Sequence, residues 1–293
     1  MLIAHASDLH VLDLKGVAPW RYLNKRLTGL VSLALARKSA HPPHIAERLV
    51  ADLLEVAPDH VLVTGDLTNL ALEPEFARAR SILEPLAELG ILSVVPGNHD
   101  VYTKGSERSA RFESFFGDLL WSDPMPESDE RYPWYRKVGD VHVLGFCSAV
   151  PRAPVMATGE VSEQQLRRLK ELSKAHSFDD GFVIAMVHHN LHPRGGRKDA
   201  MHGLDNRDIF IEALSAAGVT MVLHGHTHVA HRFRVNDMAV IGCGSSTWSS
   251  DDPSHMARYN LYQIDDGELQ AITTRIFSAE EDRFVDAGHL EVP

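Results

Sequence analysis

Short apolar runs alternate with amphipathic stretches along most of the chain, and this alternation is typical of an α/β fold. Runs rich in Val, Ile and Leu predict buried strands at residues 1–6, 60–64, 91–95, 182–187 and 219–223. Apolar residues at helical spacing predict helices at residues 19–38, 46–55, 74–89, 107–116, 162–175 and 208–217. The pattern therefore favours a mixed α/β fold with largely buried strands.

The remaining elements are short and β-rich. Two runs around Gly139-Asp140 predict a hairpin, and four further strands are expected at 231–235, 239–241, 259–264 and 269–276. There is no internal repeat and no long linker, and 293 residues suit one large α/β domain. We therefore expect a single domain over 1–293, with a helical insertion at about 19–40 and a C-terminal β segment at about 230–293.

Polar residues follow five of the predicted strands at the point where each strand ends. These residues are Asp8, Asp66, Asn98, His188 and His226. In open α/β sheets, ligands gather outside the carboxyl ends of the strands. The sequence therefore predicts that these side chains share one site.

The residue types at these strand ends are those of metal ligands. Asp8 and His10 are separated by one residue, as are His226 and His228, and Gly65 permits a tight turn before Asp66. Each pattern alone is common in turns and caps, whereas all of them together are rare by chance. The expected ligands are Asp8, His10, Asp66, Asn98, His188, His226 and His228. This mixture of nitrogen and oxygen donors suits Mn, Fe, Co, Ni or Zn, and two ions ~3.5–4 Å apart can clamp a phosphoryl group.

The amino-acid composition indicates which kinds of ligand and partner the protein can bind. The net charge of −11 disfavours nucleic acid and anionic surfaces, whereas 18 histidines favour metal binding. Two cysteines exclude a disulfide framework. No apolar run approaches the ~20 residues that span a bilayer. The apolar start at residues 1–6 is too short for a signal peptide, so a cytoplasmic location is expected.

Five motifs carry a family resemblance. They are SDLH (7–10), TGDLTN (64–69), PGNHD (96–100), VHHN (187–190) and HGHTH (224–228). Through them the chain resembles the calcineurin-like metallophosphoesterases over almost all of its length. The resemblance implies a four-layer α/β/β/α sandwich with two divalent metal ions at the strand ends, manganese being favoured. It also implies an enzyme that hydrolyses phosphodiester bonds by attack of metal-bound hydroxide.

The resemblance also implies a role for each matching residue. One metal takes Asp8, His10 and His228, the other takes Asn98, His188 and His226, and Asp66 bridges the two. His99 points at the substrate as a catalytic acid. Asp100 orients His99, since a neighbouring carboxylate raises the pKa of an imidazole and fixes its tautomer; the alternative is that Asp100 only caps the next helix. Expected substrate contacts are Asn98, His189 and His192, with Asn69, Arg194 and His202 as further pocket candidates.

The motif context, with GEVSEQQLRRL at 159–169, looks most like the class III cyclic-nucleotide phosphodiesterase branch, which implies a cAMP-type substrate. An alternative comes from the basic amphipathic stretch at 20–38, which is similar to insertions in hydrolases that cleave the pyrophosphate of UDP-2,3-diacylglucosamine-type lipid precursors. Such a helix can also contact a membrane surface peripherally, here at the inner face. A third hypothesis, a non-catalytic metal-binding scaffold, is disfavoured by the complete ligand set. The oligomeric state is left open.

Overall fold

The computed structural model describes residues 1–33, 41–120, 122, 131–178 and 181–293. Its strands form two six-stranded sheets. The first contains β1 (Leu2–Ala6), β2 (His60–Val63), β3 (Leu92–Val94), β10 (Arg258–Asp265), β11 (Glu268–Ser278) and β12 (Arg283–Leu290). The second contains β4 (Trp134–Val138), β5 (Val141–Gly145), β6 (Phe182–Met186), β7 (Met221–His224), β8 (Ala230–Val235) and β9 (Met238–Cys243). The strand orders are β12-β11-β10-β1-β2-β3 and β4-β5-β6-β7-β9-β8.

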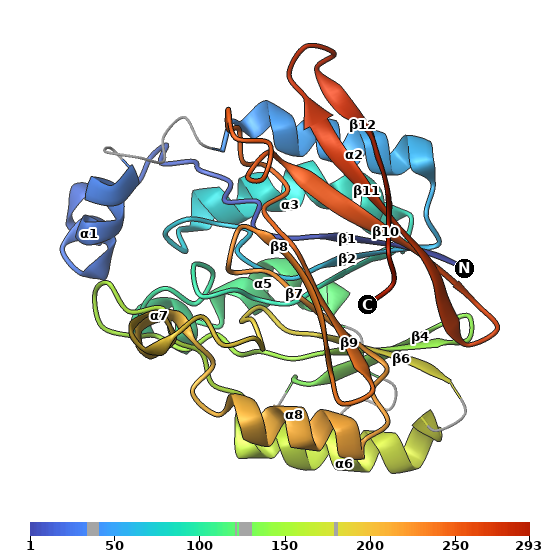
Figure 1. The fold of residues 1–293 in the computed structure, drawn as a ribbon. Helices are drawn as coiled ribbons and strands as arrows, with labels where there is room; N and C mark the ends of the chain where they lie inside the picture. The colour runs from blue at the N-terminus through green and yellow to red at the C-terminus, as the bar shows by residue number, and fades with distance from the viewer. Residues whose placement is uncertain (34–40, 121, 123–130, 179–180) are drawn as a thin grey trace.

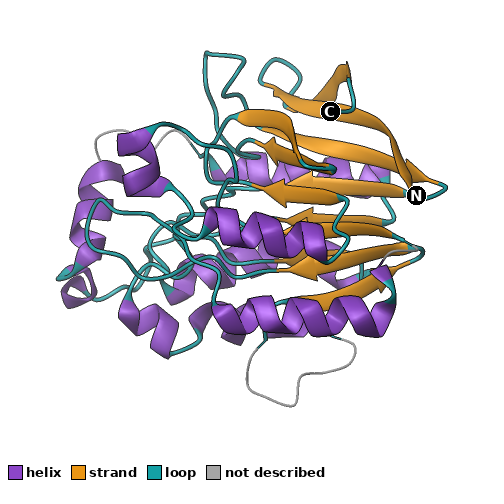
Figure 2. Cartoon of the chain, turned by 60° about the horizontal axis from the view of Figure 1, so that its bottom comes forward, coloured by secondary structure: helices purple, strands orange, loops and turns teal. Residues whose placement is uncertain are grey.

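Helices cover the outer faces of the two sheets, so the molecule has four layers (Figures 1 and 2). On the first sheet lie α2 (Pro43–Val56) and α3 (Glu73–Glu88), and on the second α6 (Glu163–His176) and α8 (Arg207–Ala216). Shorter helices lie in the connections: η1 (Pro19–Tyr22), α1 (Lys25–Ser32), α4 (Lys104–Arg108), α5 (Arg111–Phe116), η3 (Gly117–Leu119) and α7 (Gly196–His202). The expected α/β/β/α sandwich is confirmed.

Alternate residues of the central strands enter different layers of the core. On β6, Ile184 and Met186 pack into the cluster between the sheets, whereas Val183 and Ala185 pack against α6 and α8. Because both faces are covered, such strands are apolar throughout, which is why they were visible in the sequence. The cluster between the sheets draws residues from both sheets, and we infer from this that the chain forms one domain.

Parallel pairing brings the strand ends to one edge. β1, β2 and β3 are parallel, and so are β5, β6, β7 and β9. β1 also pairs with β10 in antiparallel register, with Leu2 opposite Gln263. The loops that leave β1, β2, β3, β6 and β7 therefore emerge at the same edge of the sandwich. These loops carry the predicted ligands.

Two predicted helices are interrupted. The helix expected over 19–38 is a 3₁₀ turn, η1, followed by α1 after Asn24; its last residues, 34–38, lie outside the described residues. The helix expected over 107–116 consists of α4 and α5, because Ala110 has a left-handed backbone with φ +43°. The helix at 162–175 is confirmed, and the Ser162 side chain accepts a hydrogen bond from the backbone N–H of Gln165.

In the described part of the basic stretch, residues 20–33, one basic side chain is buried instead of solvated. The guanidinium of Arg26 is buried and donates to the carbonyl oxygens of Leu70 and Ala71, at 2.7 and 3.1 Å. Burial lowers the pKa of Arg26 to about 10, with the nearby guanidinium of Arg111 adding to the effect. Arg26 therefore anchors α1 to the loop after β2. Among the described residues, no helix is long and apolar enough to cross a membrane.

Candidate metal centre

The seven predicted ligands come together at the common edge of the two sheets. They arrive from five loops, after β1, β2, β3, β6 and β7. Asp8, His10 and His188 are at most 1% exposed, and Asp66 is 2% exposed. Their side chains form two groups of donor atoms, and the carboxylate of Asp66 lies between the groups.

The first group contains two carboxylates and two imidazoles. Donor atoms of Asp8, His10, Asp66 and His228 all lie within 4.8 Å of one another. The Nε2 atoms of His10 and His228 are 3.0 Å apart, and Nε2 of His228 is 3.2 Å from Oδ1 of Asp8. Converging imidazole nitrogens and carboxylate oxygens make a donor set that fits a divalent cation.

The second group is prepared for metal by its hydrogen bonds. Nδ1 of His188 lies 2.8 Å from the Thr64 carbonyl oxygen, and Nε2 of His226 lies 2.8 Å from that of His202. In neutral rings these bonds leave the lone pairs on Nε2 of His188 and Nδ1 of His226. Those two atoms face Oδ1 of Asn98, at 3.1 and 2.9 Å. Two imidazole nitrogens and an amide oxygen that converge in this way make a donor set that fits a divalent cation.

The two groups meet at Asp66. Its Oδ2 atom lies 3.7 Å from Nε2 of His10 and 3.4 Å from Nε2 of His188. Burial opposes the charge on Asp66, but the imidazoles of His188 and His99 hold the pKa of this carboxyl well below its usual range. An ionised carboxylate between the two donor groups would serve a cation in either group.

Backbone strain accompanies the ligands. Asp8, His10, Asp66, His226 and His228 all have left-handed backbone conformations, with φ between +46° and +69°. Residues with side chains rarely adopt this conformation, which costs about 1–2 kcal/mol each, and such strain gathers at functional sites. The turns aim side chains at i and i+2 from one loop toward the same point.

Glycines make room for the ligands. A Cβ atom at Gly225 would overlap the side chains of Ser7 and Asp8, and one at Gly97 would overlap Asp66. The glycines of the GNHD and GHTH motifs are therefore needed because ligand side chains occupy the space beside them.

Burial favours the neutral form of His10 and His226. It holds the pKa of His10 well below its usual range, assisted by the nearby His41, and it does the same for His226, assisted by His189. At His188 burial also lowers the pKa, but the charge of Asp66 outweighs it and raises the pKa to about 9. Neutral imidazole is the form that binds metal, and at His188 the ion takes the place of a proton.

His99 lies beside the donor groups and is oriented differently from the prediction. Its Nδ1 atom is 2.6 Å from the carbonyl oxygen of Asn69. The oxygens of Asp100 accept hydrogen bonds from the backbone N–H groups of Leu67, Thr68 and Gly97, at 2.9 to 3.1 Å. The expectation that Asp100 orients the ring is thus corrected: the Asn69 carbonyl fixes the tautomer, and Asp100 ties the GD loop to the GNHD loop.

Two predicted substrate contacts, His189 and His192, lie against other groups of the protein. His189 is fully buried, and its ring nitrogens lie 2.7 Å from Oγ of Ser148 and 3.1 Å from the Ala157 carbonyl oxygen. The His192 ring contacts that of His231 in a tilted arrangement, with ring centroids 4.2 Å apart. Both rings thus have neighbours within the protein, and substrate contact by His189 and His192 stays a prediction.

Two adjoining cavities open at the donor groups. One of about 280 Å³ is lined by Asp66, Asn98, His99, Ala157, Arg194, His202, His226, Thr227, His228, Trp248 and His255. The other, of about 360 Å³, shares four of these residues, Asn98, His99, Ala157 and His202, and extends past Asn69 and Tyr102 to α1. Arg194, His202 and Asn69 thus line these cavities, as the sequence predicted for pocket residues.

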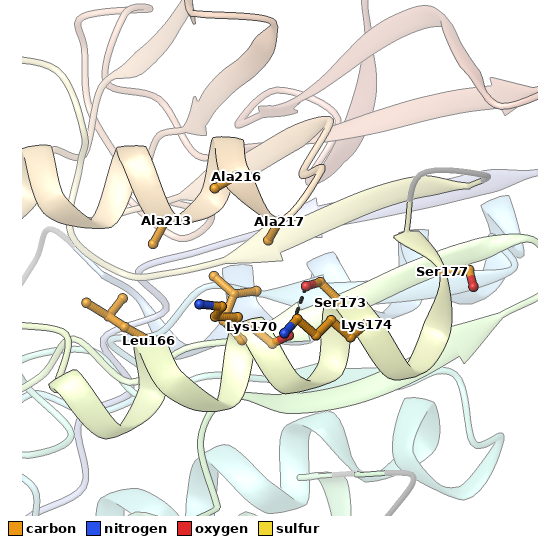
Figure 3. Close-up of a pocket in the computed structure, with 9 residues that line it drawn as sticks. Leu166, Lys170, Ser173, Lys174, Ser177, Ala213, Ala216 and Ala217 are labelled. Atoms are coloured by element: carbon orange, nitrogen blue, oxygen red, sulfur yellow. Dashed lines mark hydrogen bonds between the residues drawn. The ribbon is translucent and has the colours of Figure 1, made fainter.

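A larger cavity of about 590 Å³ lies elsewhere, between α6 and α8 (Figure 3). Its walls include Leu166, Lys170, Lys174 and Ala213, and none of the described residues lining it is a predicted ligand. Volume alone would thus misplace the site.

Sequence reasoning missed three residues at the donor groups. His41 offers a ring nitrogen within 4.8 Å of donor atoms of His10 and His228, and Trp248 and His255 line the smaller cavity. These residues stand outside the five motifs, in segments with no periodicity or spacing that marks them.

Comparisons with known proteins agree with this geometry. The model of the calcineurin-like phosphoesterase family matches residues 1–230. Proteins named "Probable cyclic nucleotide phosphodiesterase" from Vesicomyosocius okutanii and Ruthia magnifica are 21% and 19% identical. Each alignment covers 76% of this chain and 85% of the relative.

Solved structures support the same fold. A dimetal phosphatase from Danio rerio superposes with a TM-score of 0.61 at 14% identity, covering 94% of this chain and 95% of that one. A purple acid phosphatase from yellow lupin seeds gives 0.63 at 12% identity, covering 98% and 52%. With the family match and the His/Asp donor groups, these findings support a binuclear divalent metal site. The chain belongs to the calcineurin-like phosphoesterase family and is a metal-dependent phosphoester hydrolase.

Proposed function

We propose that the chain is a binuclear phosphodiesterase whose substrate is a 3′,5′-cyclic nucleotide of the cAMP type. One observation carries the two-ion part of the proposal: Oδ2 of Asp66 faces His10 and His188, which belong to different donor groups. The substrate part is supported by the names of the two relatives.

Two divalent ions, when bound, supply Lewis acidity and an activated water molecule. The ligands proposed for the first ion are Asp8, His10 and His228, those for the second are Asn98, His188 and His226, and Asp66 serves both. Oxygen donors come from Asp8, Asp66 and Asn98, and because such oxygens suit Mn²⁺ we propose manganese as the activating ion.

His99 is proposed to protonate the leaving oxygen. Its ring lines both cavities, and Nδ1 is held by the Asn69 carbonyl oxygen, so Nε2 is the atom that faces a bound ester. As an imidazolium, His99 can stabilise the charge that develops on the phosphoryl group and then release a proton to the departing alkoxide. Asp100 contributes indirectly, because its hydrogen bonds fix the loop that carries His99.

Arg194 and His202 are proposed to bind the substrate beside the phosphate. Arg194 lines the cavity over the donor groups, and a guanidinium matches the planar arrangement of phosphate oxygens. His202 extends along both cavities from the end of α7. Trp248 lines the smaller cavity, and its indole ring is proposed to stack on the nucleotide base.

The test is hydrolysis of 3′,5′-cyclic AMP by the manganese-loaded protein, with bis(p-nitrophenyl) phosphate as a control for a functional centre. Turnover of both substrates supports the proposal in full. Turnover of the chromogenic diester alone removes the cyclic nucleotide and retains the binuclear diesterase. If neither is hydrolysed by protein shown to hold two ions, the proposal is wrong.

A second candidate substrate is a nucleotide joined to a lipid through a pyrophosphate, of the UDP-2,3-diacylglucosamine type. The observation in its favour is apolar exposure beside the second cavity. Trp20, Leu23, Leu27 and Val31 are 70, 78, 52 and 52% exposed on η1, α1 and their junction. The same segment borders the cavity through Lys25, whose ammonium group donates to the Met156 carbonyl oxygen at 3.1 Å. A lipid chain or a membrane surface would cover these side chains.

This candidate is tested by sedimentation with phosphatidylglycerol vesicles and by assay of the lipid-linked pyrophosphate. We expect the double variant Leu23→Asp, Leu27→Asp to lose vesicle binding and lipid-substrate turnover while retaining bis(p-nitrophenyl) phosphate hydrolysis. A double change at exposed Leu54 and Leu89 is the matched control, since these lie on α2 and after α3. Equal vesicle binding by all three proteins would exclude a membrane role for α1.

A further inference from the structure

His41 lies at the first donor group although none of the five motifs contains it. It offers one ring nitrogen within 4.8 Å of donor atoms of His10 and His228, the same two imidazoles that face Asp8 and Asp66. The His41 and His10 ring centroids are 4.7 Å apart, and those of His41 and His228 are 5.9 Å apart. The His41 side chain is nearly buried, with 8% exposure.

Local sequence explains how His41 reaches this place. It is followed by Pro42 and Pro43, and a residue before proline is pushed out of the α-helical region into an extended conformation. Helix α2 therefore begins at Pro43, after His41, and its first residues hold His41 toward the loop that leaves β1. The residue is positioned by two rigid residues instead of by a flexible loop.

The hydrogen bonds of His41 select a tautomer. Nδ1 lies 2.8 Å from Oγ1 of Thr247, and the same hydroxyl donates to the carbonyl oxygen of Leu9 at 2.7 Å. Because the single hydroxyl proton is directed at the Leu9 carbonyl oxygen, Oγ1 of Thr247 accepts a hydrogen bond from Nδ1–H of His41. The lone pair of a neutral His41 ring then lies on Nε2. Metal-binding histidines are commonly prepared in this way by a hydrogen bond at the other nitrogen.

We propose that His41 is a further ligand, through Nε2, of the ion held by Asp8, His10 and His228. The inference rests on the proposed binuclear centre and extends it. The first position would have three imidazole nitrogens and two carboxylate oxygens, whereas the second has two imidazoles with Asn98 and Asp66. A nitrogen-rich position favours Zn²⁺, Co²⁺ or Ni²⁺ over Mn²⁺. The two positions therefore differ in metal preference.

The experiment measures metal binding and uses no substrate. Metal-free wild-type protein and the variant His41→Ala are titrated with Zn²⁺ in the presence of a chromogenic chelator, and the bound metal is counted by elemental analysis. We expect the variant to lose affinity at one of its two positions by at least about tenfold and to keep the other. The matched control is His44→Ala, on the same segment, whose side chain is 56% exposed; its two affinities should be those of the wild type.

A second variant separates ligation from packing. His41→Gly leaves a space that imidazole from solution can fill, and we expect added imidazole to restore Zn²⁺ affinity and the absorption spectrum of the Co²⁺ form. Wild-type affinities in His41→Ala, or a loss that imidazole does not restore in a folded His41→Gly protein, would overturn the inference. A wild-type protein that does not bind two ions would instead contradict the proposed function.

Discussion

Asp66 accepts a hydrogen bond from the backbone N–H of His99, with 2.7 Å between Oδ1 and the nitrogen. The other oxygen of Asp66 faces the imidazoles of both donor groups. The residue proposed to bridge the ions therefore also fixes the backbone of the residue proposed to protonate the leaving group. Metal occupancy and the position of His99 are linked through one carboxylate.

Replacing Asp66 by Asn tests the bridge. Asparagine can still accept the hydrogen bond from His99, but its neutral oxygen binds divalent cations more weakly. We expect bound metal to fall below two ions per chain and kcat to fall by more than roughly 10². Elemental analysis and steady-state kinetics measure both effects. Two bound ions with normal turnover in Asp66→Asn would contradict the bridging role.

Replacing His99 by Ala should separate chemistry from metal binding. The seven proposed ligands remain, so metal content should stay at two ions. Turnover of substrates with alkoxide leaving groups should fall by roughly 10²–10⁴, because the proton donor is lost. Bis(p-nitrophenyl) phosphate, whose leaving group needs no proton, should lose much less. Equal losses on both kinds of substrate would remove His99 from the role of acid.

Gly225 offers a test of the space beside the ligands. A methyl group there would overlap Ser7 and Asp8, so Gly225→Ala should displace Asp8 and weaken metal affinity by about 10–100-fold. Gly196→Ala is the control, because a Cβ at Gly196 meets no atom within 4 Å. Isothermal titration with Mn²⁺ measures the affinities. Equal affinities in the two variants would contradict the prediction, because the loop that carries Gly225 would then have moved without displacing Asp8.

The metal-free protein should lose stability as the pH rises. Burial lowers the pKa of His188, but Asp66 outweighs it and raises the pKa to about 9. Since this value exceeds the unfolded one of about 6.5, the contribution is fully present below pH 6.5 and is lost as the pH passes 9. It amounts to roughly 3 kcal/mol. Urea unfolding between pH 7 and pH 10 measures it, and the loss should be smaller in Asp66→Asn.

A largely buried ion pair that contains none of the proposed ligands should affect stability and leave turnover unchanged. Nη2 of Arg275 on β11 lies 2.5 Å from Oδ1 of Asp52 on α2, and the Asp52 side chain is 7% exposed. Arg275→Met would leave this carboxylate buried without a cation, with the Tyr259 hydroxyl still donating to it, and should lower the free energy of unfolding by about 3–5 kcal/mol.

The matched control is Arg283→Met, whose ion pair with Glu281 is exposed and should contribute less than about 1 kcal/mol. Denaturant titration compares the two variants. Both folded proteins should keep wild-type kcat. A small effect for Arg275→Met would mean that water reaches Asp52 once the arginine is removed.

The central strands could be predicted because they are buried on both faces. A parallel strand such as β6 is apolar throughout, and its end is marked by an abrupt change to polar residues. β12 lacks such a signal, since most of its residues are exposed at the edge of the first sheet. The break at Ala110 could not be predicted either, because alanine is a good helix former and nothing in the sequence marks the left-handed turn between α4 and α5.

The proposed ligands were predictable for a different reason: only a few residue types can bind a metal, and the turns place them at fixed spacings in the sequence. A residue that acts through its main-chain atoms can be of any type, so the sequence does not reveal it. The carbonyl oxygen of Asn69 orients His99 whatever its own side chain is, so the nearby carboxylate of Asp100 was the natural but mistaken choice. His41 was missed because its role depends on the fold bringing the start of α2 against the loop after β1.

All five motifs precede residue 230, yet the loop carrying Asp8 depends on the chain beyond them. β1 pairs with β10 at residues 260–263, and the Ser245 hydroxyl donates to the Asp8 carbonyl oxygen at 2.8 Å. During synthesis on the ribosome, β1 emerges before β10 and cannot pair with it until more than 250 further residues have been made. A nascent or truncated chain can thus contain every motif of the hydrolase and still lack the contacts that hold the Asp8 loop, so we expect the metal centre to form only after residues 245–265 have been synthesised.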